Sequence, residues 1–155
     1  MFVRAYAYLR SLGATGLRAN AMHAVLNANY LRVSLGDDYQ VPFDRICMHE
    51  FVCQGRPKGS AVHAMDVSKR LMDFGFHPPT TYFPLIVSEA LMIEPTETED
   101  KSTLDAFVKA MCQIAGEARD RPETLHDAPH ATPVRRLDEV KAARDLIVCE
   151  PTVGG

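Results

Sequence analysis

The stretch "FGFHPPTTYFPLIVSEALMIEPTETEDK", residues 74–101, contains the end of one predicted helix, two apolar runs and the start of another helix. Gly75 ends the first helix, and the two adjacent prolines that follow keep the chain extended. The runs "TYFPLIV" and "EALMIEP" are predicted as extended or strand segments, the first near an edge or bend because it contains Pro84. Asp100 is a suitable N-cap for the next helix. The acidic residues of "ETED" favour this helix start, because negative charges stabilise the positive N-terminal end of a helix.

The segments on either side extend this pattern in both directions. After Asp100 a helix carries one apolar stripe, formed by Leu104, Phe107, Val108, Met111 and Ile114. Before residue 74, "VHAMDVSKRLMDFG" predicts a helix and "RICMHEFVC" a strand of period 2, with Cys47, His49, Phe51 and Cys53 on one face. The chain begins with two predicted helices, which end at Gly13 and Gly36. The second helix has apolar residues on more than one face, so we expect it to be buried on both sides or to lie at an interface.

This order of elements predicts an α+β (or α/β) domain: an N-terminal helical hairpin and a small sheet with flanking helices. At 155 residues the chain is expected to form a single domain that buries roughly 70% of its unfolded surface. Three parts are predicted: a hairpin over 1–36, a sheet-and-helix core over 37–118, and an irregular extension over 119–155 with one short helix around 137–144.

Composition limits the possible partners. Hydrophobic residues make 46% and charged residues 24% of the chain, as in ordinary soluble proteins, and the apolar runs are too short to cross a membrane. A net charge of -3 argues against nucleic acid as the main partner. No export signal is visible, so a cytoplasmic location with reduced cysteines is expected. Residues 1–36 carry four arginines and no acid, which indicates either a solvated helix face or a docking surface.

Two groups of residues could carry chemistry on the strand and the loop after it. Cys47, His49 and Cys53 are metal-ligand types, but their spacing does not fit a closed zinc site, so buried core thiols are the preferred interpretation. Arg56 follows the strand in a Gly/Pro loop, where a guanidinium suits a carboxylate or phosphate, and a solvated surface arginine is an equal alternative.

A third candidate is the proline-rigidified loop of the opening stretch. It presents the His77 ring and the Thr80 and Thr81 hydroxyls at low entropic cost, as a preorganised binding site requires. No nucleophile, phosphate-binding glycine loop or metal cluster lies nearby in the sequence. The loop is therefore interpreted as half of a site.

Three segments carry a resemblance to a known family: "MHEFV", "DVSKRLMDFGFHPPTTYFPLIVSEALMIEPTETEDKSTLDAF" and "HDAPHATPVRRLDEVKAAR". They resemble the carboxyl-terminal region of the glycine cleavage system P-protein, the decarboxylating glycine dehydrogenase. The segment "APHATPVRRLDEV" is similar to subunit 2 of the two-subunit bacterial and archaeal form. Only the tail "DLIVCEPTVGG" carries no resemblance.

The resemblance implies the small C-terminal domain of a fold type I pyridoxal-phosphate enzyme. The family decarboxylates glycine on the cofactor, which acts as an electron sink, and transfers the aminomethyl group to the lipoyl arm of the H-protein. The family's cofactor lysine follows a histidine, whereas the five lysines here follow Pro, Ser, Asp, Val and Val. The chain is therefore expected to contain no catalytic residue, to bind no cofactor itself, and to be inactive without the large domain.

The same resemblance implies site residues and partners. Arg56 is expected to bind the substrate carboxylate, while His49, His77 and Thr80 would line the same cleft. The implied partners are the missing large domain, P-protein subunit 1 and lipoylated H-protein. Two other hypotheses remain open: a non-enzymatic module that self-associates through residues 1–36 or binds a partner, and a small zinc or thiol enzyme built on Cys47, His49 and Cys53.

Overall fold

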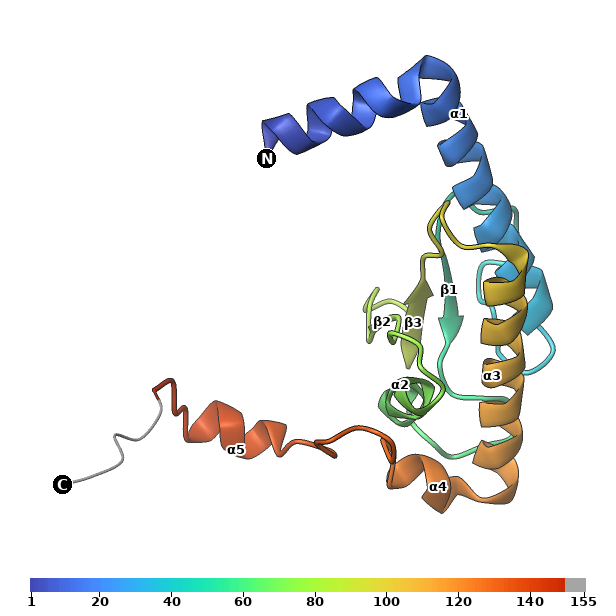
Figure 1. The fold of residues 1–155 in the computed structure, drawn as a ribbon. Helices are drawn as coiled ribbons and strands as arrows, with labels where there is room; N and C mark the ends of the chain where they lie inside the picture. The colour runs from blue at the N-terminus through green and yellow to red at the C-terminus, as the bar shows by residue number, and fades with distance from the viewer. Residues whose placement is uncertain (150–155) are drawn as a thin grey trace.

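The computed structural model describes residues 1–149 and contains helices around a small antiparallel sheet (Figure 1). Its elements are α1 (Phe2–Leu35), β1 (Phe51–Gln54), α2 (Ala64–Asp73), β2 (Thr80–Thr81), β3 (Ala90–Ile93), α3 (Lys101–Asp120), α4 (Pro122–His126) and α5 (Glu139–Arg144). This arrangement confirms the predicted small sheet with flanking helices. None of the helices in the described part is long and apolar enough to cross a membrane.

The sheet has the strand order β1-β3-β2, with both pairings antiparallel. β3 is central, so its residues pair on both sides: Met92 lies opposite Val52 of β1 and Thr80 of β2. The predicted strands were too long. Residues 45–50 have no strand structure, and Ile46 and Met48 project into solvent.

The run "TYFPLIV" is also not a continuous strand. Residues 82–89 form a loop between β2 and β3, bounded by Tyr82 and Glu89, whose φ angles of 62° and 55° are left-handed. A left-handed backbone breaks the extended ladder at both positions. The prediction that Pro84 marks an edge or bend is confirmed.

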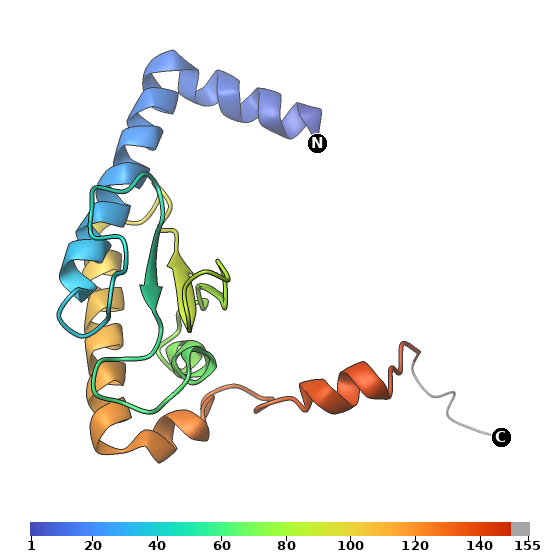
Figure 2. The same ribbon diagram turned by 180° about the vertical axis from the view of Figure 1, so that it is seen from behind.

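The core lies between the sheet and the helices α1 and α3, which run side by side on one face of it (Figures 1 and 2). The predicted stripe of α3 is confirmed: Leu104, Phe107, Met111 and Ile114 are buried, with Val108 packed against the same cluster. The predicted N-cap is confirmed as well, since the Asp100 carboxylate accepts a hydrogen bond from the Thr103 N–H at 2.8 Å. Helix α2 packs against α3 and α4.

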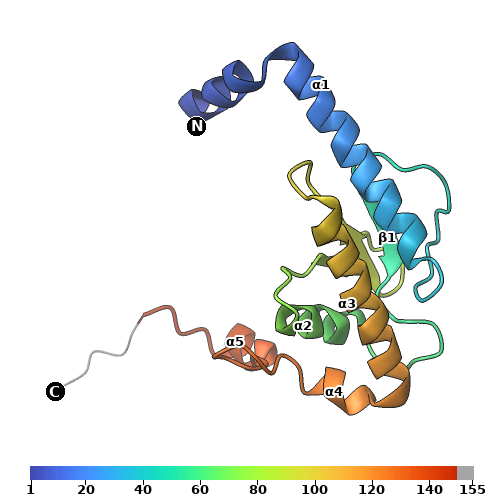
Figure 3. The ribbon, with the colours of Figure 1, turned by 45° about the vertical axis from the view of Figure 1, so that its right-hand side comes forward.

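The predicted helical hairpin over residues 1–36 is wrong. Only Gly13 leaves the helical conformation, with φ 61° and ψ -176°, and the helix continues on both sides of it. Reversal into a hairpin needs a loop of roughly two to five residues, so the two helical segments meet instead at a bend. The segment before Gly13 projects away from the domain (Figure 3). The second apolar face of α1 is exposed at Met22, Leu26 and Val33.

The bend of α1 is fixed by hydrogen bonds on its inner side. The Tyr8 hydroxyl donates to Glu97 Oε1 at 3.2 Å and accepts from Asn20 Nδ2 at 2.9 Å. Tyr8 and Asn20 lie on opposite sides of Gly13, so this contact sets the angle between the two helical segments.

The described part of the predicted extension, residues 119–149, contains more helix than predicted. α3 continues to Asp120, and Pro122 then occupies the first turn of α4, a position where a missing N–H costs no hydrogen bond. The predicted short helix is confirmed as α5. Residues 150–155 lie outside the described part of the chain.

Candidate functional site

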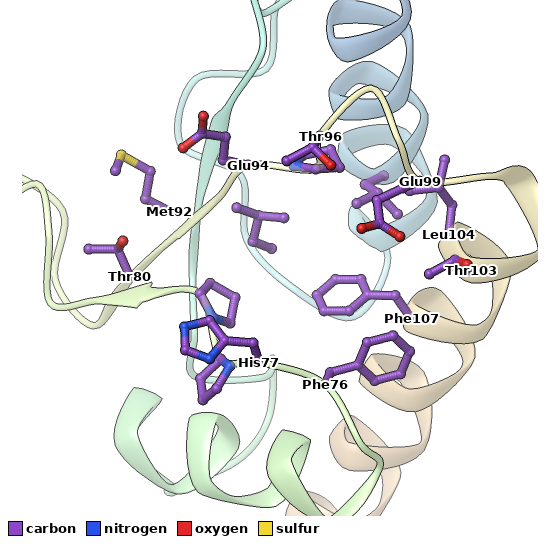
Figure 4. Close-up of a pocket in the computed structure, with 15 residues that line it drawn as sticks. Phe76, His77, Thr80, Met92, Glu94, Thr96, Glu99, Thr103, Leu104 and Phe107 are labelled. Atoms are coloured by element: carbon purple, nitrogen blue, oxygen red, sulfur yellow. The ribbon is translucent and has the colours of Figure 1, made fainter. Parts of the chain in front are cut away.

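A cavity of about 370 Å³ lies between the loop after α2, the end of β3 and the first turns of α3 (Figure 4). Its floor is apolar: the rings of Phe76 and Phe107 meet edge to face with centroids 5.4 Å apart, and Leu31, Ile93 and Leu104 complete it. The edge-to-face arrangement is a preferred geometry for aromatic pairs. The two rings therefore hold each other in place and give the floor of the cavity a defined shape.

Polar groups line the rest of this cavity. His77 and Thr80 come from the proline-rigidified loop, Glu94 and Thr96 follow β3, and Glu99 precedes α3. In Figure 4 the Glu99 carboxylate points toward the aromatic floor, while Thr80, Met92 and Glu94 lie along the opposite side. The two predicted residues, His77 and Thr80, are thus brought to one cavity with two carboxylates.

The loop that carries His77 and Thr80 is held from α2. The Thr81 hydroxyl lies 2.9 Å from the Ser68 hydroxyl of α2 and also donates to the Pro79 carbonyl at 3.1 Å. These contacts fix the loop after its two prolines. A second clamp acts at the far side, where Asn27 Nδ2 of α1 donates to the carbonyls of Thr96 and Glu99.

His49 lies in a neighbouring cavity inside the bend of α1. This cavity of about 380 Å³ shares Glu94, Pro95 and Thr96 with the first one. His49 Nε2 is 3.9 Å from Glu94 Oε1, and both side chains are half exposed. Glu94 therefore stands between His49 and the His77 cavity.

Arg56 lines neither cavity, so the four predicted site residues are not brought into one cleft by the described chain. Its Nε donates to the Val62 carbonyl at 3.2 Å, and its Nη2 lies 3.6 Å from Glu89 Oε1 and 3.4 Å from His63 Nδ1. The guanidinium already faces a carboxylate, and part of it remains exposed.

Glu89 organises this second polar group. Its carboxylate accepts hydrogen bonds from the Ala64 N–H at 2.6 Å and lies 3.1 Å from His63 Nδ1. Burial tends to raise the pKa of Glu89, but the Ala64 N–H, His63 and Arg56 outweigh burial and leave this pKa lowered. No pattern in the sequence indicates Glu89, because its role depends on a left-handed backbone that a glutamate rarely adopts.

Asp66 is another residue that the sequence reasoning missed. Its carboxylate accepts from the His63 N–H at 2.9 Å and from Arg136 Nη2 at 2.7 Å, and it lies 3.3 Å from His126 Nδ1. The H-x-x-D spacing at the start of α2 matches the reciprocal capping box that the structure shows, and it could have indicated the first contact.

The geometry does not support the hypothesis of a zinc site at Cys47, His49 and Cys53. Across residues 1–149 no three His, Cys, Asp or Glu side chains are grouped so as to hold a metal ion. Cys53 is fully buried, and burial raises the pKa of its thiol to about 12, which favours the inert protonated form. This agrees with a core thiol and opposes a zinc or thiol enzyme built on Cys53.

Similar proteins place this chain in a family. The family described as "Glycine dehydrogenase, C-terminal domain" matches residues 20–133, a range that contains every residue of the His77 cavity. Among curated proteins, a "Probable glycine dehydrogenase (decarboxylating) subunit 2" of Bacillus velezensis is 59% identical over 147 residues, 94% of this chain and 30% of that protein.

Two further relatives carry the same name. The protein of Caldanaerobacter subterraneus subsp. tengcongensis is 57% identical over 96% of this chain, and that of Desulforamulus reducens is 55% identical over 96%. This chain spans only 30 to 31% of the length of these three relatives. The chain belongs to the glycine dehydrogenase C-terminal domain family.

Proposed function

We propose that this chain is the carboxyl-terminal part of a decarboxylating glycine dehydrogenase of fold type I, acting in glycine catabolism together with a large pyridoxal-phosphate domain. The identity of 59% across 94% of the chain to a protein of that name carries the proposal. The complete enzyme would remove carbon dioxide from glycine and pass the aminomethyl group to the lipoyl arm of an H-protein. Subunit 1 is the second proposed partner, since the relatives are named as subunit 2.

The residues of this chain do not fit the role of cofactor holder. No lysine lines either cavity of the described part, and Lys58 is engaged elsewhere, donating to the Gly36 carbonyl at 2.6 Å. Pyridoxal phosphate, which supplies the electron sink when bound, would therefore be held by another part of the complete enzyme. We assign this chain the substrate side of the cleft.

Arg56 remains the proposed carboxylate-binding residue. A guanidinium binds carboxylates in a bidentate fork, and the exposed part of Arg56 is available for a second carboxylate beside Glu89. His49, His77 and Thr80 are proposed to line the cleft that forms when the large domain covers the two cavities. Their polar groups would orient the substrate and limit the access of water.

The proposal is tested with a fusion that joins the upstream part of the Bacillus velezensis relative to this chain. The fusion is combined with that organism's subunit 1 and H-protein and assayed for exchange of labelled bicarbonate into glycine. We expect exchange by the fusion, and neither exchange nor a protein-bound cofactor absorbance band from this chain alone. A fusion that folds and binds pyridoxal phosphate but shows no exchange would disprove the proposed function.

The role of Arg56 is tested in the same assay. Arg56→Ala should raise KM for glycine by about tenfold or more, because a charge-assisted pair is worth roughly 1.5–3 kcal/mol. The control is Arg135→Ala, at an exposed position outside both cavities. An unchanged KM for Arg56→Ala, with the fold intact by circular dichroism, would remove Arg56 from the site.

A non-enzymatic, self-associating module is the second candidate. The exposed apolar residues of α1 favour it, namely Phe2, Val3, Tyr6, Leu9, Met22, Leu26 and Val33. Sedimentation of the isolated chain distinguishes the two candidates together with the exchange assay. A stable dimer whose fusion is inactive would support the module.

A further inference from the structure

The loop between β2 and β3, residues 82–89, exposes apolar side chains at its tip. Leu85 is 88% exposed and Ile86 is 83% exposed, with Phe83 half exposed beside them. Single exposed apolar residues are ordinary, but a contiguous group on one loop marks a contact site.

This loop is held in a fixed shape although its tip makes no packing contacts within the core cluster. Its base is closed by hydrogen bonds from the Tyr82 N–H to the Ala90 carbonyl at 2.8 Å and from the Gly55 N–H to the Glu89 carbonyl at 2.6 Å. Within the loop, the Val87 N–H donates to the Pro84 carbonyl, and the Val87 side chain is buried.

The base of the loop also carries backbone strain. Tyr82 and Glu89 both have left-handed φ angles, which L residues seldom adopt unless their surroundings impose them. Here the Glu89 carboxylate imposes one of them by binding the Ala64 N–H at the start of α2. A strained, anchored loop that presents free apolar groups is preorganised for binding, because little order remains to be gained on contact.

The position of the loop indicates what covers it. The first segment of α1, the loop and the C-terminal extension all project from the same side of the domain (Figures 1 and 2). The relatives are more than three times as long as their matched part, and the family is described as a C-terminal domain. In the relatives, the preceding polypeptide would thus join α1 on the side that the loop faces.

We infer that loop 82–89 is a preformed apolar docking element that inserts into the upstream part of the same glycine dehydrogenase polypeptide. The inference rests on the proposed function and adds the element that makes the contact. Leu85 and Ile86 are the buried anchors of that contact, and Glu89 is the positioning residue that holds the loop for it.

Cysteine labelling tests the inference in the fusion described above. Leu85→Cys is introduced into this chain and into the fusion, and peptide mapping after maleimide treatment follows residue 85 alone. We expect labelling at residue 85 to be at least about tenfold slower in the fusion, because a buried anchor excludes solvent. The control is Ile46→Cys, at a position 84% exposed in the segment between α1 and β1 on the opposite side (Figure 3).

Two outcomes would overturn the inference. The first is equally fast labelling of residue 85 in both proteins. The second is protection of residue 85 in the isolated chain that increases with protein concentration, because a second copy of the chain would then cover the loop. Protection in a fusion without exchange activity supports the docking element and disproves the proposed function. If the Leu85→Cys fusion does not fold, the Ile86→Cys variant is labelled instead, and its result is interpreted in the same way.

Discussion

Gly55 lies where the base of the loop 82–89, β3 and α2 meet. A Cβ at this position would lie 2.6 Å from Leu91 Cγ and 2.7 Å from Ala64 Cβ, both in fully buried side chains. Gly55→Ala should therefore destabilise the chain by about 1–3 kcal/mol, the usual cost of overpacking a core. Urea unfolding followed by circular dichroism measures the change.

Gly116 provides the matched control within α3. A Cβ there meets nothing within 4 Å, so Gly116→Ala relieves the entropic cost of a helical glycine without a clash. We expect it to stabilise the chain by roughly 0.5–1 kcal/mol. Equal losses in both variants would contradict the packing argument at Gly55.

At the residue scale, the sequence predicts groups whose role depends on near neighbours in the chain. Asp100 caps α3 because the N–H that it accepts lies three residues on, a spacing visible in the sequence. His77 and Thr80 could be assigned to one site because two prolines fix the loop between α2 and β2. Glu89 and Arg136 could not be found, since their partners lie 25 and 70 residues away.

At the element scale, the C-terminal extension is attached to α2 by two buried carboxylates. Asp66 accepts from Arg136 Nη2, and Asp73 Oδ1 accepts from the backbone N–H groups of His130 and Ala131 at 2.6 and 2.7 Å. Arg136 in turn donates to the carbonyls of Leu125 and Ala128. One side chain thus ties the helix α2, the end of α4 and the extension together.

Loss of Arg136 should release this extension from the domain. Arg136→Ala leaves the Asp66 carboxylate with one partner fewer and the carbonyls of Leu125 and Ala128 without their side-chain donor. We expect thermolysin to cut residues 127–149 several-fold faster while α2 and α3 stay intact, because local opening then costs less free energy. Mass spectrometry of the fragments gives the rates.

The control for this experiment is Arg144→Ala, in a helix that buries none of its residues. Its cleavage pattern should match that of the unmodified chain. Arg136→Lys should behave like the alanine variant, since an ammonium cannot bridge the same carboxylate and two carbonyls. Full protection of Arg136→Lys would show that charge alone holds the extension.

Element predictions succeeded where the local pattern was long and failed where packing decided the result. The 20 residues of α3 repeat one apolar stripe, so both its type and its buried face could be predicted. The bend in α1 depends instead on whether Gly13 starts a loop or a single kink, and the contact of Tyr8 with Glu97 decides that. No pattern near Gly13 contains this information.

At the scale of the whole molecule, apolar surface is divided unevenly. The core cluster joins α1, α3 and the sheet, whereas the first segment of α1, loop 82–89 and the extension keep large apolar side chains in solvent. From the second apolar face of α1, the sequence predicted either burial on both sides or an interface. It could not predict the other two exposed regions, because a short apolar run has the same appearance as a buried strand.

Acid should weaken the molecule through three carboxylates that join its elements: Asp73, Glu89 and Glu117. Burial tends to raise the pKa of each, but hydrogen bonds outweigh it and leave all three lowered. For Glu117 the donors are Arg70 of α2, at 2.8 and 3.2 Å, and Gln113. A carboxyl with a lowered pKa in the folded state adds stability above its unfolded value, and this stability is lost as pH falls through the folded value.

The free energy of unfolding should therefore be level near neutral pH and fall once pH drops below the ordinary carboxyl values of 4.5 for Glu and 3.8 for Asp. Glu117→Gln removes one of these groups and replaces the carboxylate beside Arg70 with a neutral amide, while the ion pair of Arg70 with Asp73 stays. The variant should be less stable than the unmodified chain at pH 7 but lose less free energy of unfolding on acidification. The curves of free energy against pH for the two proteins should therefore approach each other at low pH. Urea titrations at pH 7, 5, 4 and 3 measure this, with Glu123→Gln, on the short helix α4, as the control. Parallel curves for the unmodified chain and Glu117→Gln would mean that the pair between α2 and α3 does not contribute to acid sensitivity.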